Sequence, residues 1–346
     1  MRYTTFGRRT GLRVSEYALG TANFTTTDRE QYRAVFDAFA EAGGTFLDSA
    51  DRYQGGASET LLGELLATDR DHFVLATKYS AGGGERPGIG ATGNSRKTMV
   101  RSLEASLRRL GTDYVDVYWA HMPDAITPVE EIATAFDDLI RAGKILHGGL
   151  SNFPAWRVAS AVTAAERLGR TPIIGVQVEY SLAERTADRE LLPMAEAFGL
   201  GAALYAPLGG GMLTGKYRAG EEGRLTRRGV GVRAEDGGQK TAVLDTVLAI
   251  AAETGASAAQ VSVAWLRAHA ARAATAFIPV IGPRTSAQLT EYLGALDLTL
   301  TEGQYTRLAE VSAVSLGNPH ETAAAAREAA LGGDADRVAA PRVPVI

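Results

Sequence analysis

Short apolar segments alternate with amphipathic segments along most of the chain. Eight of the apolar segments have the length and residue types of buried β-strands: 17–21, 45–48, 73–78, 114–119, 145–150, 173–178, 200–205 and 276–281. Between them, apolar residues recur at helical spacing, for example in 29–42, 95–109, 129–142 and 155–168. Residues typical of helix ends flank these segments: Asp28 and Ser95 as N-caps, and Gly43, Gly111, Gly143 and Gly169 as C′ glycines. The pattern predicts alternating strands and helices.

Eight strands that alternate with helices predict a parallel sheet, and eight is the number that closes a (β/α)₈ TIM barrel. Residues 2–14 precede the first strand and predict an N-terminal hairpin with its turn near Gly11. The longest interval separates the seventh strand from the eighth. It holds a Gly/Arg-rich loop, 209–238, and two helical segments, 240–254 and 258–271.

We expect one domain over residues 1–315, because no linker separates the strands. Residues 301–314 have the spacing of an additional outer helix. The tail, 316–346, is rich in Ala, Gly and Pro and is weakly periodic. It would serve as a covering flap, as a contact in a homo-oligomer, or as a disordered segment.

Charge and composition narrow the class of protein. The formal net charge of −4 argues against nucleic acid and membrane surfaces as partners. No apolar run approaches the roughly 18 residues of a membrane span, and the N-terminus lacks the apolar core of a secretory signal. With no cysteine and no paired-histidine motif, the sequence gives no reason to expect a disulfide or a metal site. We expect a soluble, cytoplasmic protein.

Polar residues and glycines end the predicted strands. They are Gly20–Thr21, Asp48, Lys78, His121, Ser151–Asn152, Gln177, Tyr205 and Gly282. A barrel would gather them around one mouth, where active sites of this fold are found. Asp48, Lys78 and His121 are the strongest signals, because they titrate and follow three successive strands. An Asp48–Lys78 pair alone would equally be a structural ion pair between two strands.

Seven motifs, in order, give the chain a resemblance to a known family. They are FLDSADRY, VLATK, VDVYWAH, GLSNF, VQVEYSL, YAPLGGGMLTGKY and IPVIGPRTSAQLTEYLGAL. The chain resembles the aldo-keto reductases from about residue 2 to 315, in the branch that includes the channel β-subunit-like members. The resemblance implies a (β/α)₈ oxidoreductase that reduces aldehydes or ketones with NADPH.

The resemblance also implies catalytic roles. Tyr53 would be the general acid, Lys78 would lower its pKa, Asp48 would anchor Lys78, and His121 would orient the carbonyl. The chemistry is reasonable, because an ammonium within about 4–6 Å favours the phenolate of a tyrosine that ordinarily titrates near pH 10. A paired carboxylate would offset the cost of burying that ammonium.

The same resemblance implies a set of residues that bind NADPH/NADP⁺. Thr21 and Ala22 would flank the nicotinamide ribose near Asp48, Ser151, Asn152 and Gln177 would hold the carboxamide, and Tyr205 would stack on the nicotinamide. Ala206, Pro207, Leu208, Gly209, Gly210 and Lys216 would surround the pyrophosphate, and Gly282, Arg284, Gln288 and Glu291 would bind the adenosine end. Arg284 would contact the 2′-phosphate, which favours NADPH over NADH. Tyr292 replaces the asparagine common in the family, so adenine recognition is left open.

The substrate pocket is predicted less directly. Phe24, Tyr79, Trp119 and Met122 are the expected lining residues. The glycine-rich segment 80–97 would form a mobile wall of that pocket. It contains GIGATG at 88–93, but this match does not directly follow a strand, as a dinucleotide-binding motif would.

Three alternatives remain beside an NADPH-dependent reductase of a small carbonyl compound. The protein would instead be an NADPH-binding sensor or regulatory subunit with little turnover, or a deoxysugar ketoreductase. The third is an aldolase in which Lys78 forms a Schiff base. That role needs a neutral amine, whereas Asp48 would keep Lys78 charged.

Overall fold

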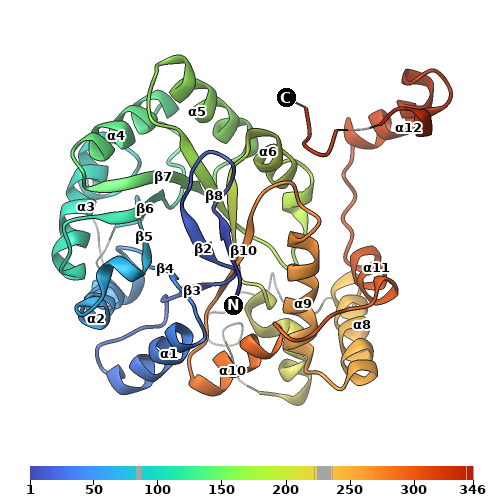
Figure 1. Ribbon diagram of the computed structural model, residues 1–346, viewed down its shortest axis with the longest axis horizontal. Helices are drawn as coiled ribbons and strands as arrows, with labels where there is room; N and C mark the ends of the chain where they lie inside the picture. Colours follow the sequence, from blue (N-terminus) through green and yellow to red (C-terminus); the bar gives the residue numbers. More distant parts are fainter. Residues whose placement is uncertain (83–87, 222, 224–234, 236, 340, 346) are drawn as a thin grey trace.

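The computed structural model describes residues 1–82, 88–221, 223, 235, 237–339 and 341–345. Eight parallel strands close into a barrel in the order β10-β3-β4-β5-β6-β7-β8-β9 (Figure 1). They are β3 (Ala18–Gly20), β4 (Phe46–Asp48), β5 (Val74–Tyr79), β6 (Val115–Ala120), β7 (Ile145–Ser151), β8 (Ile173–Glu179), β9 (Gly201–Tyr205) and β10 (Phe277–Ile281). The predicted strands and the (β/α)₈ barrel are therefore confirmed.

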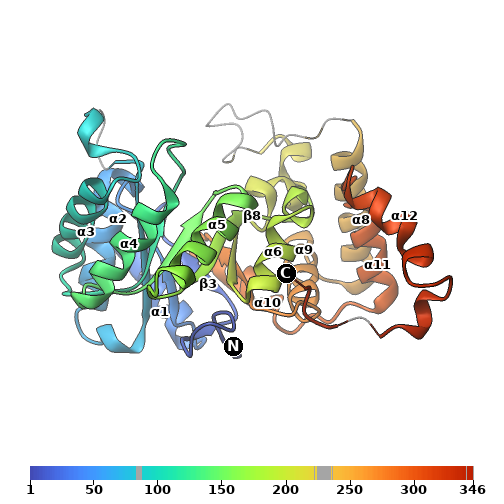
Figure 2. The same cartoon turned by 90° about the horizontal axis from the view of Figure 1, so that it is seen from above.

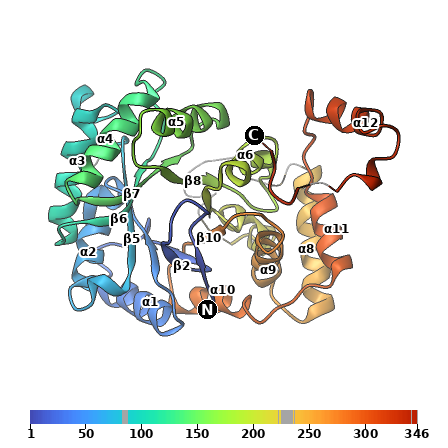
Figure 3. The ribbon, with the colours of Figure 1, turned by 45° about the horizontal axis from the view of Figure 1, so that its top comes forward.

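Helices surround the barrel on its outside (Figure 3). They are α1 (Arg29–Glu41), α2 (Ala57–Leu66), α3 (Arg96–Leu110), α4 (Val129–Arg141), α5 (Ala155–Arg167), α6 (Leu191–Phe198), α8 (Gln239–Thr254), α9 (Ala258–Ala270), α10 (Ser286–Gly294), α11 (Glu302–Val311) and α12 (His320–Ala330). Ser95 caps α3 by accepting a hydrogen bond from the Thr98 N–H, as its position predicts. Asp28 occupies the N-cap position of α1, but its side chain makes no capping bond.

The barrel interior is filled from one end by the N-terminal hairpin. Strands β1 (Tyr3–Thr5) and β2 (Arg13–Ser15) pair antiparallel, which confirms the predicted hairpin, and the hairpin crosses the barrel end that faces the viewer in Figure 1. Phe6 follows β1 and is fully buried against Phe46 and Trp119. Gly175 and Gly201 leave room for its ring, because a Cβ at either position would lie within 2.8 Å of it. With this end closed, the cleft opens at the other.

The long interval between β9 and β10 contains α8 and α9, as predicted, and α11 packs against both (Figure 2). Within the described residues, no single helix is long and apolar enough to cross a membrane. The pair α8 and α9 passes that test of length and composition only when joined, and it is bent by 98° at its break. Residues 222, 224–234 and 236 of the predicted loop 209–238 lie outside the described residues.

The tail forms α12, a helix with no buried residue that stands off the barrel beyond α11 (Figures 1 and 2). The chain then returns toward α6, and Ala335 is buried on the way (Figure 3). His320 reaches Glu190, just before α6, with 2.8 Å between Nε2 and Oε1. The division into a barrel over 1–315 and a tail over 316–346, and any role of the tail between copies of the chain, stay predictions.

Candidate active site

A large cleft lies at the carboxyl ends of the barrel strands. Its volume is about 1550 Å³, larger than the roughly 300–1,000 Å³ of a typical small-molecule site. Its walls include Asp48 at the end of β4, Gln177 on β8, Tyr205 on β9 and Val280 on β10. The cleft has room for a dinucleotide together with a second small molecule.

Three of the four predicted catalytic side chains meet in one hydrogen-bonded group. The Lys78 ammonium donates to Asp48 Oδ2 at 2.5 Å and to the Tyr53 hydroxyl oxygen at 3.1 Å. Lys78 is fully buried, whereas Tyr53 is partly exposed and lines the cleft. A buried cation therefore lies directly behind a phenol that faces the cleft.

Local backbone structure brings this group together. Asp48 ends β4, which pairs in parallel with β5, where Lys78 is the fifth residue. The Asp51 N–H then donates to the Lys78 carbonyl, and the Tyr53 N–H donates to the Ala50 carbonyl. These bonds fold the chain back over the strand ends and bring Tyr53 to Lys78.

The ammonium is stabilised in its charged form. Burial alone would lower the pKa of Lys78, but the Asp48 carboxylate and the Tyr53 oxygen outweigh it, and the pKa is raised above its ordinary value. Asp48 is held from its other side, because Gln177 Nε2 donates to its Oδ1 at 2.8 Å. Asp48 therefore links the ammonium to β8 across the barrel.

His121 lies beside the phenol and is neutral. Its ring centroid is 5.9 Å from that of Tyr53, nearly perpendicular to it, and it lines the cleft. Burial, with the charges of Lys78 and Arg52, lowers the pKa of His121 to about 3. Its buried Nδ1 has no hydrogen-bond partner among the described residues. A neutral imidazole can orient a polar group in the cleft by hydrogen bonding without adding charge.

A second polar group follows the ends of β6, β7 and β9. Asn152 Nδ2 donates to the His121 carbonyl and to Ser151 Oγ, both at 3.0 Å, and the Tyr205 hydroxyl donates to Asn152 Oδ1 at 2.8 Å. The backbone of Asn152 is left-handed, with φ of 61°. The ring of Tyr205 is thereby fixed at the cleft wall, where a flat cofactor ring would stack.

Glycines after β9 form a tight backbone cradle beside the cleft. Gly209, Gly210 and Gly211 have φ of 57°, 71° and 97°, a left-handed run that residues with a Cβ rarely adopt. At Gly211 a Cβ would lie 3.0 Å from Lys216 Cε, so the glycine admits the lysine to the cleft wall. Such a run, next to a lysine, suits a phosphate group.

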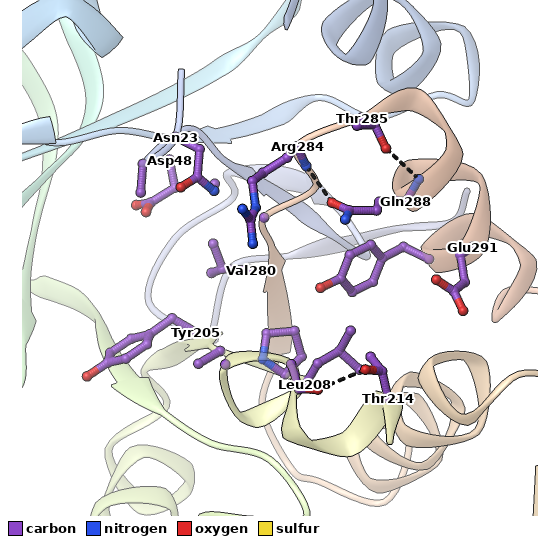
Figure 4. A pocket seen from close by; sticks show the side chains of 18 of the residues that line it. Asn23, Asp48, Tyr205, Leu208, Thr214, Val280, Arg284, Thr285, Gln288 and Glu291 are labelled. Atoms are coloured by element: carbon purple, nitrogen blue, oxygen red, sulfur yellow. Dashed lines mark hydrogen bonds between the residues drawn. The ribbon is translucent and has the colours of Figure 1, made fainter. Parts of the chain in front are cut away.

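The opposite wall is built around the start of α10. Thr285 caps this helix by accepting from the Gln288 N–H, and Gln288 Oε1 accepts from the Arg284 N–H at 2.8 Å. Figure 4 shows Arg284 and Glu291 on this wall, across the cleft from Leu208. Within the described part of the chain, no carboxylate forms an ion pair with the Arg284 guanidinium, which is available for an anion.

Most of the predicted cofactor residues line this one cleft. They are Ala22, Asp48, Ser151, Asn152, Gln177, Tyr205, Ala206, Pro207, Leu208, Gly210, Lys216, Gly282, Arg284, Gln288 and Glu291. Thr21 and Gly209 are buried and are not among the lining residues. Thr21 instead ties the end of β3 to β4, because its N–H donates to the Asp48 carbonyl. Tyr292 also lines the cleft, and burial raises the pKa of its hydroxyl.

The predicted substrate pocket needs correction. Met122 lines the cleft, but Phe24, Tyr79 and Trp119 are fully buried and belong to the hydrophobic core. Packing against neighbouring aromatic rings explains the burial of all three. Residues 83–87 of the predicted wall 80–97 lie outside the described residues, and none of the described remainder lines the cleft.

Several lining residues escaped the sequence reasoning. Asn23 and Gln31 lie outside the strand ends on which it relied. Arg52 and Gln54 flank Tyr53 and line the cleft beside it. Gln54 has φ of 52°, and its Nε2 donates to the Ala22 carbonyl at 2.8 Å. Their adjacency to Tyr53 was the signal that could have found them.

Comparison with known proteins places the chain in a family of reductases. The model of the aldo/keto reductase family matches residues 17–313. An aldo-keto reductase, ausK, of Aspergillus calidoustus is 33% identical over 92% of this chain and 84% of its own length. An uncharacterized oxidoreductase, YrpG, of Bacillus subtilis is 36% identical over 87% and 92%. A norsolorinic acid reductase of Aspergillus flavus is 34% identical over 89% and 80%.

Proposed function

The chain belongs to the aldo/keto reductase family of oxidoreductases, and from that premise we propose that it reduces an aldehyde or ketone to an alcohol with NADPH. The single observation that carries the proposal is the contact between Tyr53 and Lys78, at 3.1 Å, at the wall of a cleft large enough for a dinucleotide and a substrate. Without that contact, the same cleft would support binding alone.

The residues supply what carbonyl reduction needs. A bound reduced nicotinamide supplies a hydride, which leaves negative charge on the carbonyl oxygen. Tyr53 donates its proton to that oxygen, and the Lys78 ammonium stabilises the negative charge left on the phenol. His121, neutral and adjacent, donates a hydrogen bond that orients the carbonyl. Asp48 keeps Lys78 charged and does not itself exchange a proton.

The cofactor assignment rests on the chemistry of the cleft walls. Ser151, Asn152 and Gln177 would hold the carboxamide and Tyr205 would stack on the ring. The glycine cradle with Lys216 would bind the pyrophosphate. Arg284 would bind the 2′-phosphate, since its guanidinium has no ion-pair partner among the described residues. This last contact is the reason to prefer NADPH over NADH.

The alternative functions are less well supported. A Schiff-base aldolase needs a neutral lysine, and the raised pKa of Lys78, set by Asp48 and Tyr53 against its burial, opposes that state. A binding-only sensor has no use for a buried ammonium behind a phenol that faces the cleft. A deoxysugar ketoreductase shares the proposed chemistry and differs only in its substrate.

The test is Tyr53→Phe, measured by NADPH oxidation over aldehydes, ketones and keto-sugars, with NADH in parallel. We expect turnover to fall at least about 100-fold, the usual loss when a general acid is removed. Affinity for NADPH, measured by fluorescence quenching, would be nearly unchanged. Tyr114→Phe is the matched control, because that hydroxyl is exposed and binds Asp71. Full activity in Tyr53→Phe would remove Tyr53 from the proton-donor role.

A further inference from the structure

Arg52 occupies a place at the catalytic end of the cleft that the proposed mechanism does not use. It directly precedes Tyr53, lines the cleft, and its side chain is exposed. Its positive charge is one of the causes of the low pKa of His121, after burial and Lys78, so the guanidinium acts on the imidazole that would meet the substrate. Arg52 thus lines the same cleft as Tyr53 and His121, the two side chains that would meet the carbonyl.

The guanidinium has no protein partner within the described part of the chain. No carboxylate there lies within ion-pair distance of it, and its side chain makes no hydrogen bond with the described residues. Asp48, the cleft carboxylate nearest to Arg52 in the sequence, already binds Lys78 and Gln177. Arg218, another cleft arginine, is by contrast paired with both Glu235 and Asp245.

The backbone around Arg52 is held in place. The Gly55 N–H donates to the Arg52 carbonyl at 3.2 Å. Gln54, in a left-handed conformation, anchors the turn to the Ala22 carbonyl. A side chain that leaves such a fixed turn loses less freedom when it binds a ligand than one on a mobile loop.

Met122 lies at the same end of the cleft. It directly follows His121, the residue is 43% exposed, and it lines the cleft. Its backbone is fixed on both sides, because its N–H donates to Ser80 Oγ at 3.0 Å and its carbonyl accepts from Asn94 Nδ2 at 2.9 Å. A cation with no ion-pair partner among the described residues and an exposed apolar side chain thus line the same cleft as Tyr53 and His121.

We propose that Arg52 is a specificity-determining residue that binds an anionic group, carboxylate or phosphate, on the carbonyl substrate, while Met122 contacts the apolar part of the same molecule. The inference rests on the proposed reductase function and adds the substrate class. A guanidinium presents two parallel N–H donors that match the two oxygens of a carboxylate or phosphate, and such charge-assisted pairs are the strongest hydrogen bonds available to a side chain.

The test compares a carboxylate substrate with its neutral ester. NADPH oxidation is measured with 4-carboxybenzaldehyde, methyl 4-formylbenzoate and 4-formylphenyl phosphate, in the full chain and in Arg52→Met. We expect the preference for the acid over the ester to fall about 10- to 100-fold in Arg52→Met, the range of a charge-assisted hydrogen bond. The change would lie in KM for the anion and not in kcat. The anionic substrate, carboxylate or phosphate, whose preference over the ester falls more in Arg52→Met carries the group that Arg52 recognises.

Two control variants separate recognition from general charge. Arg52→Lys keeps the charge but loses the paired donors, and we expect it to retain part of the preference. Arg13→Met removes an exposed positive charge from β2, at the closed end of the barrel, and would leave the preference as in the unmodified chain. An unchanged ratio of anion to ester in Arg52→Met would overturn the proposal.

Failure of the proposed function would show itself separately. If the unmodified chain oxidised NADPH with none of the three aldehydes, binding of 4-carboxybenzaldehyde would be measured by calorimetry with NADP⁺ present. Weaker binding to Arg52→Met than to the unmodified chain would support the anion site without catalysis. Equal binding to both would reject it.

Discussion

At the scale of single residues, Lys78 shows how the fold makes a buried charge tolerable. Its ammonium has three N–H donors and three acceptors: Asp48 Oδ2 at 2.5 Å, the Ser49 carbonyl at 2.7 Å and the Tyr53 hydroxyl at 3.1 Å. Burying an unpaired ammonium would cost several kcal/mol, and each of these contacts offsets part of that cost. The Tyr53 oxygen is thus both a stabilising acceptor and the proposed proton donor.

Lys78 both balances the buried Asp48 charge and contacts the proposed proton donor, so we expect that its effects on stability and on activity can be separated by mutation. Lys78→Met would leave the Asp48 carboxylate buried without its cation, and we expect a loss of about 3–5 kcal/mol in unfolding free energy. The double variant Asp48→Asn with Lys78→Met removes both charges, so most of that stability would return. Activity would stay at least about 100-fold low in both, because the phenol loses its ammonium. Denaturant unfolding and NADPH oxidation measure the two effects.

One outcome would contradict a catalytic role for Lys78. Recovery of turnover in the double variant would mean that Lys78 acts only as the structural partner of Asp48. That is the structural ion pair that the sequence, taken alone, also allows.

At the scale of elements, the sequence predicts what depends on local pattern and misses what depends on packing. The strands could be recognised because each is a short apolar run ended by polar residues or glycine, and a barrel buries them on both faces. Asp48, Lys78 and His121 were found for the same reason, since strand ends are fixed by topology. Arg52 could not be recognised as a candidate site residue in this way. Its candidacy depends on the absence of an ion-pair partner among the described residues, and no sequence pattern reveals such an absence.

The prediction of the residues that line the substrate pocket was wrong for a related reason. Trp119 was expected at its wall, but alternate residues of β6 point into the barrel, and Trp119 is one of them. Its indole fills the barrel core and requires glycine on the next strand. A Cβ on Gly149 of β7 would lie 2.3 Å from Trp119 Cζ3 and 3.1 Å from the Gly175 carbonyl oxygen. Gly149 is thus a packing residue and not a flexible one.

Gly149→Ala should therefore destabilise the barrel. Overpacking of this kind costs about 1–3 kcal/mol, seen as a lower midpoint of thermal or denaturant unfolding. Gly303→Ala is the matched control. Gly303 lies in α11, and a Cβ there meets nothing within 4 Å. We expect that variant to be as stable as the unmodified chain or slightly more stable, because alanine favours the helix. Equal midpoints for the two variants would contradict the packing role of Gly149.

At the scale of the whole molecule, a buried acidic cluster joins the catalytic turn to the helical shell. Asp51 and Glu59 are both buried, and Glu59 accepts from Arg109 Nε at 2.7 Å and from Thr77 Oγ1 at 2.5 Å. Asp51 Oδ1 has no hydrogen-bond partner among the described residues. The cluster therefore connects the turn before Tyr53, α2, β5 and α3, and Arg109 forms an ion pair with Glu59 within it.

This arrangement lets Asp51 keep its proton to a higher pH than an ordinary aspartate. Burial, followed by the charge of Glu59, raises the pKa of Asp51 to about 7 from its ordinary 3.8, against the opposing effects of Arg109, Ser102 and the Arg52 N–H. Between those two pH values the folded protein binds a proton at Asp51 that the unfolded chain has lost. Stability attributable to Asp51 is then fully present below about pH 4 and is lost as the pH rises toward 7.

Asp51→Asn should remove this pH dependence, because the amide has nearly the same shape and carries no charge at any pH. The unmodified chain and the variant would have similar unfolding free energies near pH 4. The variant would be more stable at pH 8 by up to about 4 kcal/mol, at about 1.4 kcal/mol per pK unit. Denaturant unfolding at both pH values measures the difference, and Asp37→Asn, an exposed carboxylate on α1, is the control for charge alone. Parallel stability curves for Asp51→Asn and the unmodified chain would show that Asp51 ionises as freely in the fold as in the unfolded chain, and that the turn before Tyr53 carries no buried proton.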